Sequence, residues 1–148
     1  MPPTPISIDG RAVSVHGRID RIDRTDAGLV LVDYKTNKAD YTRKMRQMIE
    51  FQMLVYMRAL AQQTGLPVIS GAFVSVPGAT VSGELRADDA ELLDALSAQL
   101  GRNLDAVLDA HFFPHAAQPS DGKCIHYCDF QHLCRLCLTP KRQDVPSA

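Results

Sequence analysis

Residues 17–37, GRIDRIDRTDAGLVLVDYKTN, contain two strand patterns joined by a turn. Apolar and polar residues alternate over residues 11–25, and the phase slips near Gly17, which predicts a strand with a bulge. Residues 29–36 (LVLVDYKT) are a nearly continuous apolar run ending in charge, which predicts a second strand buried on both faces. Turn residues Asp26-Ala27-Gly28 join the two strands into a hairpin.

This hairpin brings charged side chains together. Because side chains alternate along a strand, Asp33 and Lys35 share one face and Tyr34 lies on the other. A hairpin with that turn pairs residues whose numbers sum to 53, so Asp20 lies opposite Asp33. The Cβ atoms of directly opposed residues are about 4.5–5.5 Å apart. Two carboxylates this close repel one another unless one is protonated or a cation lies between them.

A hard divalent cation, Mg²⁺ or Mn²⁺, is the natural partner of such a pair. The predicted ligands are Asp20, Asp33 and a strand carbonyl near Tyr34. Lys35 could position or deprotonate a water, or neutralise charge growing on a phosphate. A bulge or an extra loop residue would change the register and make Asp23 the ligand instead. The alternative is a surface ion pair at a strand end, without a metal.

The rest of the chain alternates helical and strand patterns. Helical spacing predicts one long helix over residues 41–63, ended by a Gly-Leu-Pro turn. Residues 68–76 predict a strand, and residues 79–86 a less buried partner strand. A second helix is expected over residues 88–110, with Asp88 as its N-cap. The order strand, strand, helix, strand, strand, helix indicates one α+β domain.

Three short motifs resemble the RecB-type nuclease domains of the PD-(D/E)XK superfamily, and the resemblance covers most of the chain. The motifs are GRID at residues 17–20, DYK at residues 33–35, and Gln52 with Tyr56 in FQMLVYMRAL. The resemblance implies a restriction-endonuclease-like core of α+β or α/β type, in which helices flank a mixed central sheet. A C-terminal segment clipped by cysteines is expected to follow.

The resemblance also assigns roles to residues. It implies that Asp20 and Asp33 bind the metal, that Lys35 is catalytic, and that Gln52 and Tyr56 complete the site. These last two are four residues apart, so they share one helical face; ordinary helix packing would explain that spacing as well. The implied reaction is hydrolysis of phosphodiester bonds by a metal-activated water.

All four cysteines lie near the C-terminal end, at Cys124, Cys128, Cys134 and Cys137. Clustered cysteines in a reducing compartment more often hold a metal than form disulfides. Their spacing resembles the iron–sulfur members of the same family, AddB-type helicase–nuclease subunits and CRISPR-adaptation nucleases. Those proteins have three clustered cysteines and a fourth far upstream.

Cys128 and Cys134 fit one interval of that pattern, whereas Cys124 lies one residue too far away and no upstream cysteine exists. Either Cys137 replaces the upstream ligand and closes a 4Fe-4S cluster, or the chain is a fragment and the cluster is incomplete or absent. A four-cysteine zinc site and free buried cysteines are the other two alternatives.

Length and composition favour a single domain over residues 1–148, with a core at about 5–110, a cysteine segment at 111–139 and a polar tail at 140–148. The net charge of -1 does not suit a protein that holds DNA by charge alone. No segment is apolar enough to span a membrane and no signal peptide is visible, so a cytoplasmic setting is expected.

Family members carry a metal-ligand His on a helix before the first strand, and that helix has no counterpart here. We expect the five histidines to be surface or packing residues rather than ligands. They are His16, His111, His115, His126 and His132. The basic run Arg43, Lys44 and Arg46 suits either phosphate contact or a solvated helix face.

The leading hypothesis is therefore a Mg²⁺- or Mn²⁺-dependent DNA nuclease domain of exonuclease type. It would act in recombination and repair on single strands or DNA ends delivered by a helicase subunit or domain, and it would need more chain if the missing helix is required for cleavage. One alternative is a catalytically silent module of the same fold that binds DNA ends or serves as a scaffold. Another is a zinc-clipped interaction domain without a DNA role.

Overall fold

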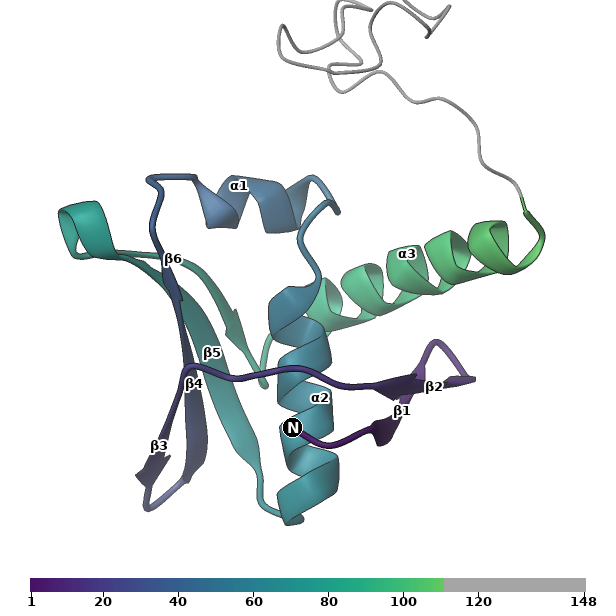
Figure 1. The fold of residues 1–148 in the computed structure, drawn as a ribbon, viewed down its shortest axis with the longest axis horizontal. Helices are drawn as coiled ribbons and strands as arrows, with labels where there is room; N and C mark the ends of the chain where they lie inside the picture. The colour runs from purple at the N-terminus through teal and green to yellow at the C-terminus, as the bar shows by residue number, and fades with distance from the viewer. Residues whose placement is uncertain (111–148) are drawn as a thin grey trace, which may run out of the picture. The chain divides into compact units, whose positions relative to one another are not determined.

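The computed structural model describes residues 1–110, and residues 1–105 of these form one compact unit. The first four elements are strands, and two helices, two further strands and a long helix follow (Figure 1). Their bounds are β1 Thr4–Ile8, β2 Arg11–Val15, β3 Arg21–Thr25, β4 Gly28–Lys35, α1 Tyr41–Arg46, α2 Gln52–Thr64, β5 Val68–Ser75, the 3-10 turn η1 Val76–Gly78, β6 Thr80–Arg86 and α3 Ala90–Leu108.

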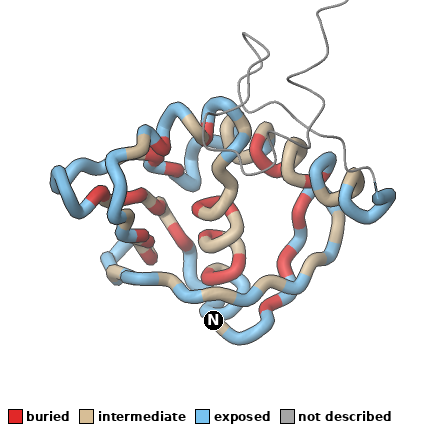
Figure 2. The backbone as a smooth tube through the Cα atoms, turned by 45° about the horizontal axis from the view of Figure 1, so that its top comes forward, coloured by how far each residue is buried: buried red, intermediate tan, exposed pale blue. Residues whose placement is uncertain are grey.

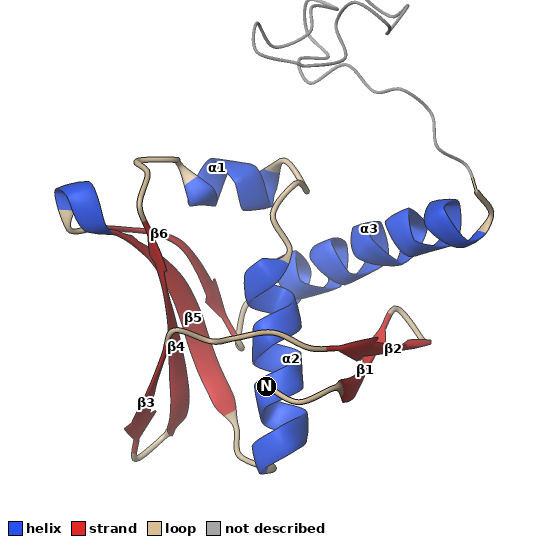
Figure 3. Cartoon of the chain, in the orientation of Figure 1, coloured by secondary structure: helices blue, strands red, loops and turns tan. Residues whose placement is uncertain are grey.

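The central sheet has four strands in the order β3-β4-β5-β6. β3 pairs with β4 and β5 with β6 in antiparallel fashion, whereas β4 and β5 are parallel. The parallel pair needs a long crossover connection, which α1 and α2 provide. α2 lies between this sheet and the separate β1–β2 hairpin (Figure 3). A mixed sheet flanked by helices is the predicted fold class, and it is confirmed.

The main core joins α2 to the central sheet, and Figure 2 marks the buried positions along the backbone in red. Its fully buried members include Leu31 on β4, Met53 and Leu54 on α2, and Phe73 on β5. On β4 only alternate residues are buried, and Val30 and Val32 on the other face are half-exposed. The expectation that this strand is buried on both faces was therefore wrong for the described chain.

The strand predicted over residues 11–25 is two strands in two different sheets. The chain leaves β2 at Val15, passes through an irregular segment that contains His16 and Gly17, and enters β3 at Arg21. β2 pairs instead with β1, through a two-residue turn in which Asp9 and Gly10 both have positive φ (49° and 77°). Such turns match the twist of a hairpin, so β2 is held by its own partner strand and not by β3.

The long helix predicted over residues 41–63 is also divided. α1 ends at Arg46 and α2 begins at Gln52. Met48, between them, has a φ of 55°, a left-handed conformation that a helix cannot contain. The apolar spacing continues across this break, which is why the sequence pattern did not reveal it.

The last helix lies where the sequence predicted it, but a different residue caps its start. α3 begins at Ala90, and the Asp89 carboxylate accepts a 3.2 Å hydrogen bond from the Leu92 amide. Asp88, the predicted cap, pairs instead with Arg86 on β6 at 3.0 Å. Within residues 1–110, no helix has the length and apolar character needed to cross a bilayer.

Candidate active site

The β3–β4 hairpin has the register that the turn predicted. Arg21 pairs with Val32 and Thr25 with Gly28, so the numbers of paired residues sum to 53. The ladder ends at Arg21, and Asp20 lies in the bend just before it. The Asp20 Oδ2 atom accepts a 3.0 Å hydrogen bond from the Tyr34 amide. Asp20 is thus held against the end of β4 at Tyr34, the residue next to Asp33, although the two aspartates are not paired in the ladder as predicted.

Asp33, Lys35 and Gln52 form a closed triangle of contacts. The Lys35 ammonium lies 2.8 Å from Asp33 Oδ2 and donates a 2.8 Å hydrogen bond to Gln52 Oε1. The Gln52 Nε2 group donates to Asp33 Oδ1 at 3.0 Å. Only this orientation of the carboxamide suits both neighbours, because its oxygen faces the cation and its amino group faces the carboxylate. β4 supplies two members of the triangle and the first residue of α2 supplies the third.

This triangle is largely removed from water. The Asp33 side chain is 6% exposed and the Lys35 side chain 24% exposed. The Lys35 ammonium lies 5.1 Å from the centre of the Phe73 ring and 5.8 Å from that of Tyr41. Burial is the largest single influence on the pKa of Lys35 and lowers it, but Asp33, Tyr41 and Glu50 together raise it, and the net shift is upward. Lys35 is therefore held as a cation that can act electrostatically.

Tyr56 lies one helical turn after Gln52 on α2, and it borders the segment that leads to Asp20. A Cβ atom added at Gly17 would lie 3.5 Å from the Tyr56 hydroxyl, in ordinary contact. The tyrosine is half-buried, and its ring packs on the backbone of the glycine. α2 thus extends its contact from Asp33 to the first motif of the resemblance.

Asp23, the alternative ligand, is directed elsewhere. It pairs with Val30 in the ladder, which places it on the face opposite to Asp33. Its carboxylate accepts a 2.9 Å hydrogen bond from Arg21, and the same guanidinium donates to the Tyr34 hydroxyl at 3.2 Å. The structure therefore brings Asp20, and not Asp23, to the end of β4.

The residues present suit a hard cation. Asp33 Oδ2 is buried and has no hydrogen-bond partner within residues 1–110, although it forms the ion pair with Lys35. The same residues contain no group of three or more His, Cys, Asp or Glu side chains arranged around a metal. Two carboxylates, Asp20 and Asp33, are nevertheless what Mg²⁺ usually takes from a protein, with waters and substrate phosphate as its other ligands.

Glu50 is a neighbour of the site that no sequence motif marked. Its Oε1 atom accepts a 2.9 Å hydrogen bond from the Gln52 amide, and its charge adds to the upward pKa shift of Lys35. The available signal was a carboxylate two residues before the start of a helix, where it can accept from free amides. That signal was hidden because residues 41–63 were expected to form one helix.

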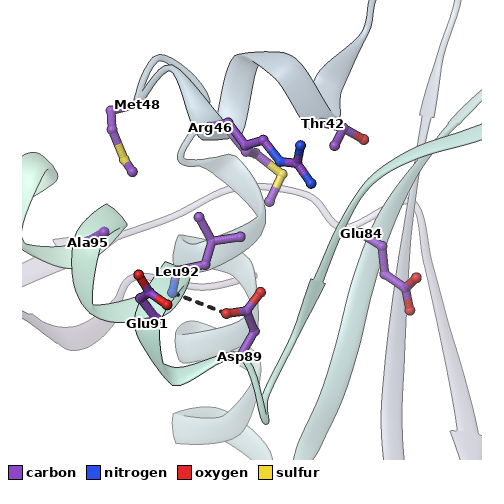
Figure 4. A pocket seen from close by; sticks show the side chains of 9 residues that line it. Thr42, Arg46, Met48, Glu84, Asp89, Glu91, Leu92 and Ala95 are labelled. Carbon is purple, nitrogen blue, oxygen red and sulfur yellow. Dashed lines mark hydrogen bonds between the residues drawn. The ribbon is translucent and has the colours of Figure 1, made fainter.

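A pocket of about 340 Å³ lies apart from this cluster, between α1, β6 and the start of α3 (Figure 4). Arg46, Glu84, Asp89 and Glu91 contribute polar side chains to it. Its lining shares no residue with Asp20, Asp33, Lys35 or Gln52. This pocket is therefore separate from the candidate active site at the end of β4.

Two other predicted features are the basic run of α1, which the structure describes, and the cysteine cluster, which lies outside the described residues. Arg43 and Arg46 are exposed in the last turn of α1, and the Lys44 ammonium lies 4.8 Å from the centre of the Tyr41 ring. Their contact with phosphates remains a prediction. All four cysteines and the histidines from His111 onward fall outside residues 1–110.

Comparison with known proteins gives the family of the chain. The sequence model of the PD-(D/E)XK nuclease superfamily matches residues 2–135, which include both motifs of the hairpin and the start of α2. A search of curated proteins found no match. Because the superfamily model matches most of the chain, the chain belongs to the PD-(D/E)XK nuclease superfamily.

Proposed function

We propose that this chain is a metal-dependent DNA nuclease domain that hydrolyses phosphodiester bonds. The observation that carries the proposal is the buried triangle of Asp33, Lys35 and Gln52, with Asp20 at the end of the paired strand. A scaffold has no physical need for a lysine and a carboxylate buried together at a strand end, since burying charge costs free energy. Membership of the nuclease superfamily also supports this proposal.

Each residue has a distinct part in the proposed reaction. Asp20 and Asp33 would hold Mg²⁺ or Mn²⁺, with the strand carbonyl of Tyr34 as a further ligand. The bound metal supplies a Lewis acid and a water of lowered pKa. The Lys35 ammonium neutralises charge that develops on the phosphate. Gln52 keeps Lys35 and Asp33 in place, and Tyr56 supports the segment that carries Asp20.

The biological setting is also part of the proposal. The resemblance to RecB-type and AddB-like domains supports a role in recombination and repair, with exonuclease-type cleavage of single strands or DNA ends. A net charge of -1 gives weak nonspecific attraction to DNA. This balance supports a helicase partner, or a larger protein, that delivers the strand to the site.

The test compares two aspartates on opposite faces of the hairpin. D33N removes a metal-binding carboxylate, so Mg²⁺-dependent cleavage of labelled single- and double-stranded DNA should fall on the order of a hundredfold or more. K35A should have a similar effect. D23N is the matched control, because Asp23 pairs with Arg21 on the other face, and it should cleave like the wild type.

Metal binding gives a second measurement on the same proteins. Mn²⁺ should raise the thermal midpoint of the wild type and of D23N, since a ligand that binds only the folded state stabilises it. D33N should show no such rise while its circular dichroism spectrum stays native. Full cleavage by D33N would refute the assignment. A wild type that binds DNA ends but never cuts them would indicate the silent module.

We also propose that the C-terminal cysteines hold a 4Fe-4S cluster through Cys124, Cys128, Cys134 and Cys137. Anaerobically purified protein should then show broad visible absorbance and contain iron and sulfide, and C128S should lose all three signals. The cluster would act as a structural clip. Zinc without iron would contradict the proposal and leave the four-thiolate zinc site.

A further inference from the structure

Glu50 approaches the site from the short segment between α1 and α2. Its Oε1 atom accepts a 2.9 Å hydrogen bond from the amide of Gln52, the first residue of α2. The first amides of a helix have no partner within the helix. Phe51, at the N-cap position, forms no side-chain hydrogen bond there. Glu50 therefore supplies the acceptor that the capping residue does not.

This hydrogen bond fixes the backbone of Gln52, a residue of the candidate active site. The residue whose amide Glu50 fixes is the one whose side chain donates to Asp33 at 3.0 Å and accepts from Lys35 at 2.8 Å. A rotation of the first turn of α2 would move the Gln52 carboxamide away from both partners. In the segment before the helix, the backbone hydrogen bonds of Met48 and Ile49 lead back to α1, whereas the hydrogen bond of Glu50 leads forward to α2.

The position of Glu50 is also electrostatically favourable. A carboxylate beside the first turn of a helix interacts well with the partial positive charge of the free amides. Glu50 is half-buried, so solvent screens this interaction less than at a fully exposed position. The left-handed Met48 directs the chain so that Glu50 precedes the helix instead of continuing α1.

We propose that Glu50 is a positioning residue for the cleavage reaction, which fixes the first turn of α2 and thereby holds the Gln52 carboxamide between Asp33 and Lys35. The inference rests on the proposed nuclease function and adds to it a residue outside the three motifs. Glu50 acts through the Gln52 backbone, so its acceptor oxygen carries the positioning role, and its charge only strengthens the contact with the helix start.

Two substitutions distinguish the effect of the Glu50 acceptor oxygen from the effect of its charge. E50A removes both, whereas E50Q keeps an acceptor oxygen and removes only the charge. D89A is the matched control, because Asp89 accepts a hydrogen bond from the Leu92 amide at the start of α3 and contacts none of the site residues. All three are made in the full chain, and thermal midpoints are measured alongside kinetics.

The expected result is a division between kcat and stability. E50A should lower kcat about 10- to 100-fold with little change in KM, as expected when a reacting group is displaced by about 1 Å. E50Q should stay close to wild type. D89A should lower the thermal midpoint as E50A does but keep wild-type kcat. The proposal is overturned if E50A loses no more activity than D89A, or if E50Q is as impaired as E50A.

A second readout does not depend on cleavage. The side-chain amide signals of Gln52 in a ¹H–¹⁵N NMR spectrum can be assigned by their loss in Q52L. They should move toward the positions of solvated glutamines in E50A and stay in place in E50Q and D89A. Unmoved signals in E50A would refute the positioning role. If the wild type fails to cut DNA, the nuclease proposal fails, while these signals still decide the role of Glu50.

Discussion

Gly83 on β6 shows how tightly the surroundings of Lys35 are packed. A Cβ atom there would lie 2.7 Å from Tyr41 Cβ and 2.9 Å from the Phe73 ring, closer than real Cβ contacts. These two rings stack at a centroid distance of 4.4 Å and flank the Lys35 ammonium. The backbone of Gly83 is itself left-handed, with a φ of 60°.

G83A should therefore lose more stability than a glycine substitution at an open position. Gly65, at the end of α2, has a similar φ of 66° but no atom within 4 Å of its Cβ position, so G65A should lose only about 1–2 kcal/mol from strain. G83A should lose about 1–3 kcal/mol more through overpacking. Urea unfolding of both variants measures the difference, and equal losses would contradict the crowding.

Sequence rules predicted the placement of individual side chains where strands and hairpins impose a fixed spacing. Alternation along a strand put Asp33 and Lys35 on one face, as the structure has them. Turn arithmetic gave the correct register of the hairpin, but the ladder ends at Arg21, so Asp20 is not paired with Asp33 as predicted. Glu50 escaped these rules, because its contact depends on the left-handed Met48, and a methionine gives no local signal for that conformation. The catalytic and metal-binding roles of these residues remain predictions.

At the scale of elements, the start of α3 offers a test of helix capping. Asp89, and not Asp88, accepts the amide hydrogen bond, so D89A should lower the unfolding free energy by about 0.5–2 kcal/mol. D88A should have the smaller effect, because Asp88 forms only an exposed ion pair with Arg86, and such pairs add little. Thermal unfolding of the two variants distinguishes them. A larger loss in D88A would restore the original prediction.

The sequence pattern did not reveal the strand β1, because its residue types are unusual for a strand. β1 is rich in proline at its start, and prolines argue against a strand, yet its inward residues Thr4, Ile6 and Ile8 are buried. The Asp9-Gly10 turn after it was the available signal. The buried isoleucines pack with Ala59 of α2, so tertiary contact decided what local preference did not.

The sequence predicted the class of fold better than it predicted which strands pair in the central sheet. Two hairpins separated by a helical region followed from the pattern, and β3–β4 and β5–β6 both form. The parallel pairing of β4 with β5 has no local signal, since it joins strands on either side of α1 and α2. The long-range part of the fold therefore came from the family resemblance, and the superfamily match agrees with it.

The strand order β3-β4-β5-β6 has a consequence for solubility. Both outer strands carry exposed charges, Arg21 and Arg24 on β3 and Glu84 and Arg86 on β6. The β5–β6 pairing is also irregular between Gly71 and Phe73. Free edge strands can template aggregation, and charges and bulges oppose the docking of a foreign strand. Within residues 1–110, where β3 has β4 as its neighbour in the sheet, the arginines of the RIDRIDR segment thus keep the outer edge charged, beside the carboxylate that the same segment contributes to the proposed metal site.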